Sequence, residues 1–191
     1  MTQPDTSVGS VTARTVLGPD EIARALTRIA HEILEANQGA DDLVLLGIPT
    51  RGVHLAERLA DRLSTITGDD FRARTGALDV TMHRDDLRGT PTRASHPTRI
   101  PACGIDDRVV VLVDDVLYSG RTIRAALDAL ADLGRPRAVR LAVLVDRGHR
   151  ELPIRADSVG KNLPSARSEH VSILLDEVDG HDAVTIEGRD A

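Results

Sequence analysis

The chain has 191 residues, of which 41% are apolar, and a formal net charge of −6 at pH 7. This length suits one domain with a full hydrophobic core. The acidic net charge argues against a generic nucleic-acid binder, although it leaves room for a local basic patch. Aromatic residues make up only 1%, which nearly excludes base stacking on aromatic platforms. Cys103 is the one cysteine, so an intrachain disulfide and a cysteine-based zinc site are excluded.

Apolar runs in the chain are short. The longest, at 43–48 and 109–113, are far below the length of a membrane span. The first residues also lack the charged-then-apolar pattern of a secretory signal. We therefore expect a cytoplasmic protein with no membrane association. The small and polar composition of residues 1–15 predicts a mobile N-terminal tail.

The first elements after this tail alternate between helix and strand. Pro19 suits the first position of a helix, and apolar residues recur at helical spacing over 22–33 before Gly39 offers a stop. Residues 43–48 are typical of a short buried strand. Helical spacing of apolar residues over 53–63 predicts a second helix.

The second half of the chain continues this alternation. Further strands are predicted at 77–82, 109–113, 139–145, 171–175 and 183–186. A segment with little periodicity, about 84–107, is long enough to be either a lid or a disordered loop. The alternation predicts an α/β fold in one domain, residues 16–191, with a mostly parallel sheet flanked by helices.

The stretch from Val109 to Thr122 carries the most chemical information. Five aliphatic residues run into the adjacent carboxylates Asp114 and Asp115, and a loop with Gly120 then leads into a helical pattern. An open helix N-terminus suits a phosphate, and the acid pair suits a diol or a metal held beside it. A strand that ends in a glycine turn is common in any α/β protein. Adjacent acids before a phosphate loop, however, are unfavourable without a ligand or a cation, so we favour a site for a ribose 5′-phosphate.

Two further segments are candidate anion sites. Pro49-Thr50-Arg51-Gly52 follows the strand at 43–48, where Gly52 would let a ligand approach the backbone and Arg51 offers a guanidinium for phosphate oxygens. A simple turn with a solvated arginine is the alternative. The arginine-rich loop from Arg84 would close over a charged leaving group, unless it is only a flexible solvated loop.

These motifs together resemble a known family. Asp114-Asp-Val-Leu-Tyr-Ser-Gly-Arg-Thr122 resembles the phosphoribosyl-diphosphate motif of type I phosphoribosyltransferases, and most closely the branch of pyrimidine-operon regulators that are also uracil phosphoribosyltransferases. Relatives usually have Thr in place of Ser119, so the hydroxyl is kept. Gly47-Ile-Pro-Thr-Arg-Gly52 resembles the pyrophosphate loop of that family. The resemblance implies the type I phosphoribosyltransferase fold, with a flexible catalytic loop at 84–107 and a small hood over 146–191.

The resemblance also implies an activity. Uracil and phosphoribosyl diphosphate would give UMP and pyrophosphate, with Mg²⁺ bound mainly through the diphosphate substrate and with no protein metal ligand assigned. Catalysis would rest on Asp114, Asp115, Arg51 and Arg84. The residues implied for substrate binding are Thr50, Arg51, Gly52, Asp114, Asp115, Val116, Leu117, Tyr118, Ser119, Gly120, Arg121 and Thr122. No general base is evident in the sequence.

Two other surfaces gain a role from the resemblance. The segments 146–157 and 159–162 would contact uracil, although charged loop residues are more often merely solvated. The first helix presents an exposed stripe that includes Arg24 and Glu35 and that by itself is typical of any solvated helix face. Residues implied in binding of messenger RNA are Thr27, Arg28, His31, Arg150, Arg155 and Lys161.

Several alternatives remain open at this point. The chain could be an RNA-binding regulator that uses the pocket only to sense UMP, or a purine phosphoribosyltransferase. A receiver-like signalling domain also has adjacent acids at a strand end, but there the pair follows the first strand. The resemblance suggests a homodimer or a higher homo-oligomer. It leaves open whether regulation acts on transcription or on translation of the pyrimidine genes.

Overall fold

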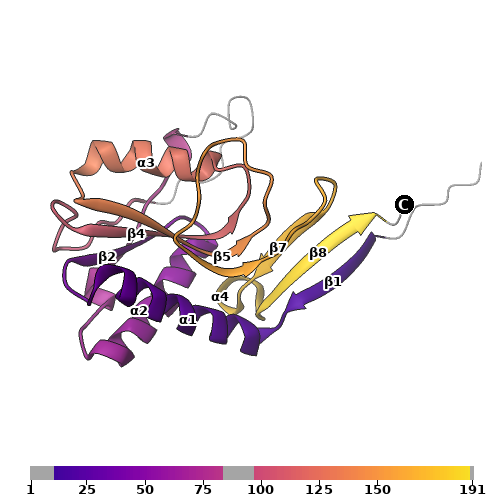
Figure 1. The fold of residues 1–191 in the computed structure, drawn as a ribbon, viewed down its shortest axis with the longest axis horizontal. Coiled ribbons are helices and arrows are strands. Elements are labelled where there is room, and N and C mark those ends of the chain that lie inside the picture. Colours follow the sequence, from indigo (N-terminus) through magenta and orange to yellow (C-terminus); the bar gives the residue numbers. More distant parts are fainter. Residues whose placement is uncertain (1–10, 84–96, 190–191) are drawn as a thin grey trace, which may run out of the picture.

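The structure, a computed structural model, describes residues 11–83 and 97–189. Within them, a five-stranded parallel sheet has the strand order β3-β2-β4-β5-β6, and a three-stranded antiparallel sheet has the order β1-β8-β7 (Figure 1). The strands of the larger sheet are β2 (Leu43–Gly47), β3 (Thr75–Ala77), β4 (Val109–Leu117), β5 (Ala138–Asp146) and β6 (Ser158–Asn162). This arrangement confirms the predicted α/β fold with a parallel central sheet.

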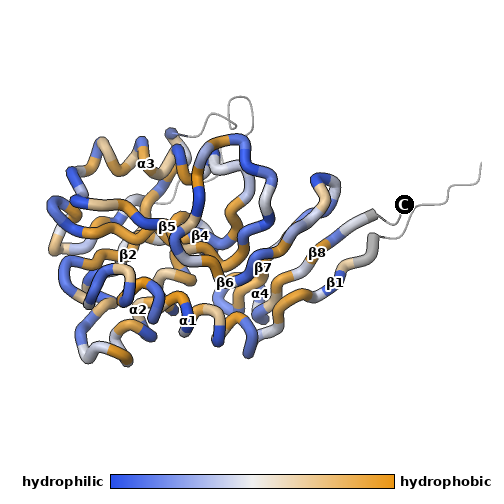
Figure 2. The backbone as a smooth tube through the Cα atoms, viewed as in Figure 1, coloured by the Kyte–Doolittle hydropathy of each residue, from blue (hydrophilic) through white to orange (hydrophobic). Residues whose placement is uncertain are grey.

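Helices cover both faces of the central sheet. Helices α1 (Pro19–Asn37) and α2 (Arg51–Thr67) pack on one face, and α3 (Arg121–Leu133) packs on the other (Figure 1). Alternate residues of β2 and β4 enter the two cores, so both strands are apolar almost throughout, as Figure 2 shows along the central sheet. No helix in the described part of the chain is long and apolar enough to cross a membrane.

The smaller sheet forms a hood beside the central one. It consists of β1 (Val11–Leu17), β7 (His170–Leu174) and β8 (Ala183–Arg189), with a short helix α4 (Asp176–Asp179) between the last two strands. The tail predicted over 1–15 is therefore too long, because β1 pairs with β8 from Val11 onward. Ala13, Arg14 and Thr15 are all exposed, so this strand carries no apolar alternation that the sequence could reveal. Residues 1–10 lie outside the described residues.

The hood also differs from the predicted span of 146–191. Strand β6 belongs to the central sheet, where it pairs with β5 in parallel. The hood instead contains β1, which comes from the N-terminal part of the chain. The signal for β6 was weak because Lys161 and Asn162 are exposed at its end. Hood and central sheet share the core that includes α1 and α2.

The predicted strand at 77–82 is wrong. Strand β3 ends at Ala77, and Thr81–His83 form a 3-10 turn. Leu78 and Val80 are buried without strand pairing, so their burial imitates the alternation of a strand. Of the predicted loop at 84–107, residues 84–96 lie outside the described residues. The remainder packs closely: Arg99 bridges to Ala77, and Ile105 is buried.

Candidate functional site

Three loops meet at one edge of the central sheet. They follow the carboxyl ends of β2, β4 and β5, which are neighbouring parallel strands. This edge is where open α/β sheets bind ligands. The predicted site segments around Arg51, Asp114 and Asp146 are thus brought to the same side of the molecule.

The loop after β4 forms a small cradle at the N-terminus of α3. A pocket of about 160 Å³ is lined by Asp114 and by residues 116–123. Gly120 precedes the helix with φ 94°, a left-handed conformation that favours glycine. Gly120 has no side chain that could cap the first turn of α3, although the Arg121 N–H donates to Ser119 Oγ over 3.4 Å. The start of this helix therefore suits an anion. We call residues 116–122 the phosphate loop.

The two predicted carboxylates lie at the end of β4. The Asp115 N–H donates to Asp114 Oδ1 over 3.0 Å, and the Val116 N–H donates to Asp115 Oδ1 over 2.8 Å. Asp114 is only 6% exposed and lines the phosphate-loop pocket, whereas Asp115 is half-buried. Asp114 therefore lies in the same pocket as the phosphate loop, and Asp115 follows it directly in β4.

The loop after β5 is fastened to the phosphate loop by main-chain hydrogen bonds. The Glu151 and Leu152 N–H groups both donate to the Ser119 carbonyl, over 3.0 and 3.2 Å, and the Arg147 N–H donates to the Leu117 carbonyl over 3.1 Å. Arg121 also pairs with Glu151 at 2.8 Å. A shift of either loop would therefore move the other.

Arg150 belongs to this connection between the two loops. Its guanidinium pairs with Asp146 and donates to the carbonyl oxygens of Tyr118 and Ile154, over 2.9 and 3.0 Å. Its side chain is only 23% exposed. The resemblance implied an RNA contact for Arg150, but the structure places its guanidinium in the interior of the loop pair.

A second pocket, of about 300 Å³, opens between the loop after β5 and the end of β6. Its lining residues are Asp146, Arg147, Gly148, His149, Asn162, Pro164 and Ser165. Arg147 is 6% exposed, donates to Ser165 Oγ over 3.0 Å, and lies 4.5 Å from the centre of the Tyr118 ring. Both Arg147 and His149 lie in the segment 146–157 that the resemblance implied would contact uracil, although neither was named individually as a site residue.

The loop after β2 is packed tightly against β4. A Cβ atom on Gly47 would lie 2.4 Å from the Gly52 carbonyl oxygen, and one on Gly52 would lie 2.5 Å from the Val113 carbonyl oxygen. The Ile48 N–H donates to the same Val113 oxygen over 2.9 Å, and the Pro49–Thr50 peptide bond is cis. The missing side chain of Gly52 lets α2 begin against the sheet. The expectation that a ligand approaches the Gly52 backbone stays a prediction. We call residues 48–52 the diphosphate loop.

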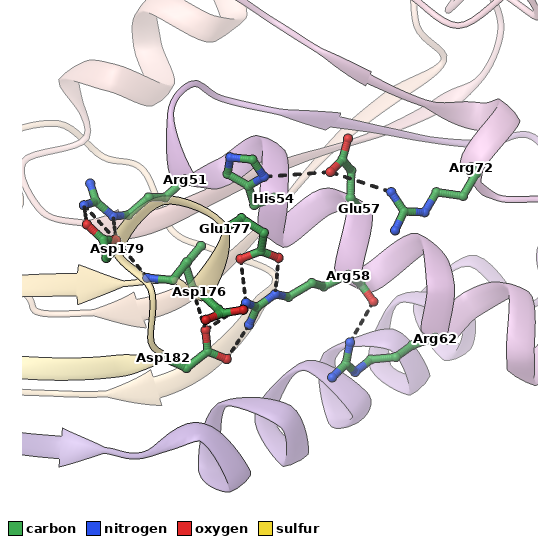
Figure 3. A network of polar contacts seen from close by, with 11 residues as sticks. Arg51, His54, Glu57, Arg58, Arg62, Arg72, Asp176, Glu177, Asp179 and Asp182 are labelled. Carbon is green, nitrogen blue, oxygen red and sulfur yellow. Dashed lines mark hydrogen bonds and ion pairs between the residues drawn. The ribbon is translucent and has the colours of Figure 1, made fainter.

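Arg51 connects the diphosphate loop to the hood by an ion pair. Its Nη2 lies 2.8 Å from Asp179 Oδ1, and its Nε lies 3.2 Å from Asp179 Oδ2 (Figure 3). This hydrogen bonding, together with the Leu175 N–H, holds the pKa of Asp179 below its ordinary value. Local sequence patterns could not identify Asp179 as a partner of Arg51, because the two residues are 128 positions apart in the chain. The predicted catalytic residue Arg84 lies outside the described residues.

A further pocket, of about 310 Å³, lies beside the diphosphate loop. Its lining residues are Pro49, Thr50, Val53, His54, Glu57, Ala77, Pro97 and Arg99. Glu57 lies 3.8 Å from both His54 and Arg99, so the pocket carries mixed charge. Its residues place Thr50 at the junction of this pocket and the diphosphate loop.

The predicted RNA-binding residues are only partly together. Thr27, Arg28 and His31 are exposed along α1, and the Arg28 guanidinium donates to the carbonyls of Val159 and Gly160 in β6 over 3.0 and 2.7 Å. This contact places α1 beside Lys161, which is exposed. Arg155 is also exposed, on the loop before β6.

Residues 11–83 and 97–189 contain no group of three or more His, Cys, Asp or Glu side chains arranged to hold a metal ion. The acid pair at the end of β4 therefore offers two carboxylates at most from that set of side chains.

The comparisons with known proteins agree with this geometry. The family model for the phosphoribosyl transferase domain matches residues 16–177. Proteins named Bifunctional protein PyrR are 67% identical in Leifsonia xyli subsp. xyli, over 91% of this chain and 96% of the relative, and 66% identical in Streptomyces coelicolor, over 94% and 92%. The chain belongs to the PyrR family of phosphoribosyltransferases. The PyrR assignment rules out the receiver-like alternative.

Solved structures similar to this PyrR family member carry the same fold. A hypoxanthine phosphoribosyltransferase from Staphylococcus aureus has a TM-score of 0.65 and 17% identity over 90% of both chains. A hypoxanthine-guanine phosphoribosyltransferase from Bacillus anthracis has a TM-score of 0.67 and 15% identity, over 92% of this chain and 98% of that one. At such low identity these similarities establish the type I phosphoribosyltransferase fold, and the choice of base must come from the site.

Proposed function

We propose that this chain transfers the phosphoribosyl group from phosphoribosyl diphosphate to uracil, and that the pocket filled by UMP controls binding to a pyrimidine-gene leader RNA. The observation that carries the proposal is the convergence of Asp114, Asp115, the phosphate loop and Arg51 at one sheet edge. Identities of 55–67% to proteins named Bifunctional protein PyrR support the same function.

The substrate fits the site by its chemistry. The 5′-phosphate occupies the phosphate loop, where the N–H groups at the start of α3 and the hydroxyls of Ser119 and Thr122 can donate to its oxygens. Asp114 and Asp115 accept hydrogen bonds from the ribose hydroxyls. Thr50, Arg51 and the N-terminus of α2 face the diphosphate.

Mg²⁺ suits the donor set at this edge. Two carboxylates, with substrate oxygens and water, match the oxygen ligands and incomplete protein cage that Mg²⁺ prefers. Asp114 and Asp115 would lie beside the ion, and oxygens of the diphosphate would supply most of its ligands. The ion would neutralise charge on the diphosphate as that group leaves.

The reaction breaks the bond between C1 of the ribose and the diphosphate oxygen. Positive charge grows on the sugar, and Arg51, together with Arg84 of the arginine-rich loop, stabilises the negative charge on pyrophosphate. The uracil N1 attacks C1 as the C1–oxygen bond breaks, and its proton passes to the solvent. We assign no side chain as the general base. The pocket after β5, with Arg147 and the main chain of residues 146–149, receives the carbonyl oxygens of uracil.

A base-competition assay tests the enzymatic proposal. Pyrophosphate release from phosphoribosyl diphosphate is measured with uracil, and then with hypoxanthine at the same concentration. We expect turnover with uracil and almost none with hypoxanthine, and the reverse order would establish a purine enzyme. Tight UMP binding without any uracil-dependent release would establish a regulator that only senses UMP.

RNA binding is proposed for the exposed face that joins α1 to β6. Its residues are Thr27, His31, Arg155 and Lys161, with Arg28 at the junction. Lys161→Ala is a sharper test than Arg28→Ala, because Arg28 also holds α1 to β6. In a gel-shift titration with and without UMP, we expect Lys161→Ala to weaken leader-RNA binding while UMP synthesis stays intact. The matched control is Arg167→Ala, another exposed cation.

We further propose that the protein acts in the cytoplasm as a homodimer or a higher homo-oligomer. Its substrates and a leader RNA are found there, and the oligomer is the assembly that the family resemblance of the sequence motifs implies. Light scattering on the purified protein measures the mass directly, and a value of 20.5 kDa would show a monomer.

A further inference from the structure

Two arginines on α2 connect the diphosphate loop to the hood. Arg51 and Arg58 are seven residues apart, about two helical turns, so both face the same side of α2. Arg51 pairs with Asp179, and Arg58 pairs with Glu177 and Asp182 at 2.6 Å each (Figure 3). Helix α4 and the turn after it are therefore held against α2 at two separate points.

Asp179 leaves part of the Arg51 guanidinium available. The carboxylate contacts Nε and Nη2, which is the side-on edge of the group. A guanidinium has five N–H donors in a fixed plane, so Nη1 and the second hydrogen of Nη2 remain for another bidentate acceptor. In Figure 3 the nitrogen that Asp179 does not contact points away from it. One arginine can thus bind Asp179 and a phosphate group together.

Asp179 is itself firmly placed. Its Oδ2 accepts from the Leu175 N–H over 2.9 Å, and its own N–H donates to the Leu175 carbonyl over 2.7 Å. The Arg58 pairs with Glu177 and Asp182 secure the same hood segment without using Arg51. Arg51 and Asp179 are 26% and 18% exposed, so water competes only weakly for their contact.

We propose that Asp179 is a positioning residue for the diphosphate, acting by holding the Arg51 guanidinium side-on so that its free edge receives the leaving group. This inference rests on the proposed function. An arginine side chain that is already ordered loses less rotamer freedom when the diphosphate binds. Asp179 stays in place during binding, because the second acceptor uses a different edge of Arg51.

A double-mutant cycle tests this role. Affinities for magnesium pyrophosphate and for UMP are measured by calorimetry in the wild type, Asp179→Asn, Arg51→Ala and the double variant. We expect Asp179→Asn to weaken pyrophosphate roughly five- to tenfold and to raise KM for phosphoribosyl diphosphate similarly. UMP has no diphosphate, so its affinity should stay within about twofold. In the Arg51→Ala background, Asp179→Asn should change pyrophosphate affinity by less than about twofold.

Other results would overturn the proposal. Tighter pyrophosphate binding in Asp179→Asn would show that Asp179 competes with the ligand, and an equal loss in the Arg51→Ala background would show that it acts by another route. Glu177→Gln is the matched control, because it weakens the Arg58 contact and leaves the Arg51 pair; a loss as large as that of Asp179→Asn would assign the effect to hood docking in general. Pyrophosphate titration needs no turnover, so this test stands apart from the failure of uracil-dependent activity.

Discussion

The phosphate loop and the diphosphate loop lie at the same sheet edge, yet different interactions hold them in place. The phosphate loop is held largely by main-chain hydrogen bonds to the loop after β5, at Ser119 and Leu117. The diphosphate loop is connected to the hood by side-chain ion pairs of α2, such as that of Arg51 with Asp179. The first kind of contact uses main-chain groups, which a change of side chain does not remove. The second joins residues far apart in the sequence, and single substitutions can remove it.

The largest expected effect comes from Gly47, where the diphosphate loop is held by close main-chain packing and not by an ion pair. Gly47→Ala would put a Cβ atom 2.4 Å from backbone atoms of Gly52 and Val53, which cannot rotate away. We expect a loss of about 3 kcal/mol or more in the free energy of unfolding, measured by urea denaturation. The matched control is Gly18→Ala, whose Cβ would have its nearest neighbour at 3.9 Å. Similar stability of both variants would contradict the packing described for this loop.

The next effect concerns the connection between the phosphate loop and the loop after β5. Arg150→Ala removes the partner of Asp146 and leaves the carbonyls of Tyr118 and Ile154 without this donor. We expect about 2 to 3 kcal/mol lower stability and weaker UMP binding, measured by calorimetry. Arg155→Ala, at an exposed position, should leave both unchanged. If Arg150→Ala weakened RNA binding alone, its side chain would be a direct RNA contact.

A smaller effect is expected when the hood loses its second attachment. Arg58→Ala leaves Glu177 and Asp182 without their cation. These two half-buried ion pairs together should contribute about 1 to 2 kcal/mol to the free energy of unfolding. UMP affinity should stay the same, because neither Glu177 nor Asp182 lines the pocket of the phosphate loop. Arg72→Ala removes a more exposed pair with Asp61 and serves as the control in thermal melts. A drop in UMP affinity with Arg58→Ala would show that the two sides are coupled.

The smallest effect is a dependence of hood stability on pH. Hydrogen bonds from Arg58 lower the pKa of Glu177 and Asp182 below their ordinary values of 4.5 and 3.8. A lowered folded-state pKa stabilises the protein above those ordinary values, and the stabilisation is lost as the pH falls through the folded-state pKa. We expect melting temperatures between pH 6 and pH 3 to fall less steeply in Arg58→Ala than in the wild type. Parallel curves would contradict this assignment.

The sequence predicted the parts of the site that follow from local pattern. The acid pair of Asp114 and Asp115, the turn at Gly120 and the helix after it are contiguous, so strand and helix periodicity place them correctly. Strand β1 was missed because Ala13, Arg14 and Thr15 are exposed in succession, which leaves no apolar period to detect. The strand predicted at 77–82 failed for the opposite reason, since Leu78 and Val80 are buried without pairing.

Side-chain partnerships were beyond reach from a single sequence. Nothing local links Arg51 to Asp179 or Arg58 to Asp182, because the hood returns to α2 only after more than a hundred residues. Arg150 shows the same limit: its sequence context is a charged loop, and only the fold shows that its guanidinium points inward. Local sequence patterns predicted the course of the main chain around the acid pair and the phosphate loop. Which charged side chains pair with one another depends on the tertiary structure.

The phosphate loop and the diphosphate loop are held in place by separate contacts. The most direct test of this independence is a pair of calorimetric titrations on Arg51→Ala, one with UMP and one with magnesium pyrophosphate. In the proposed function UMP occupies the phosphate loop and the pocket after β5, so its affinity should stay within about twofold of the wild type. Pyrophosphate loses the guanidinium at the diphosphate loop and should bind about tenfold more weakly or worse. Equal losses for both ligands, or no loss for pyrophosphate, would contradict the account.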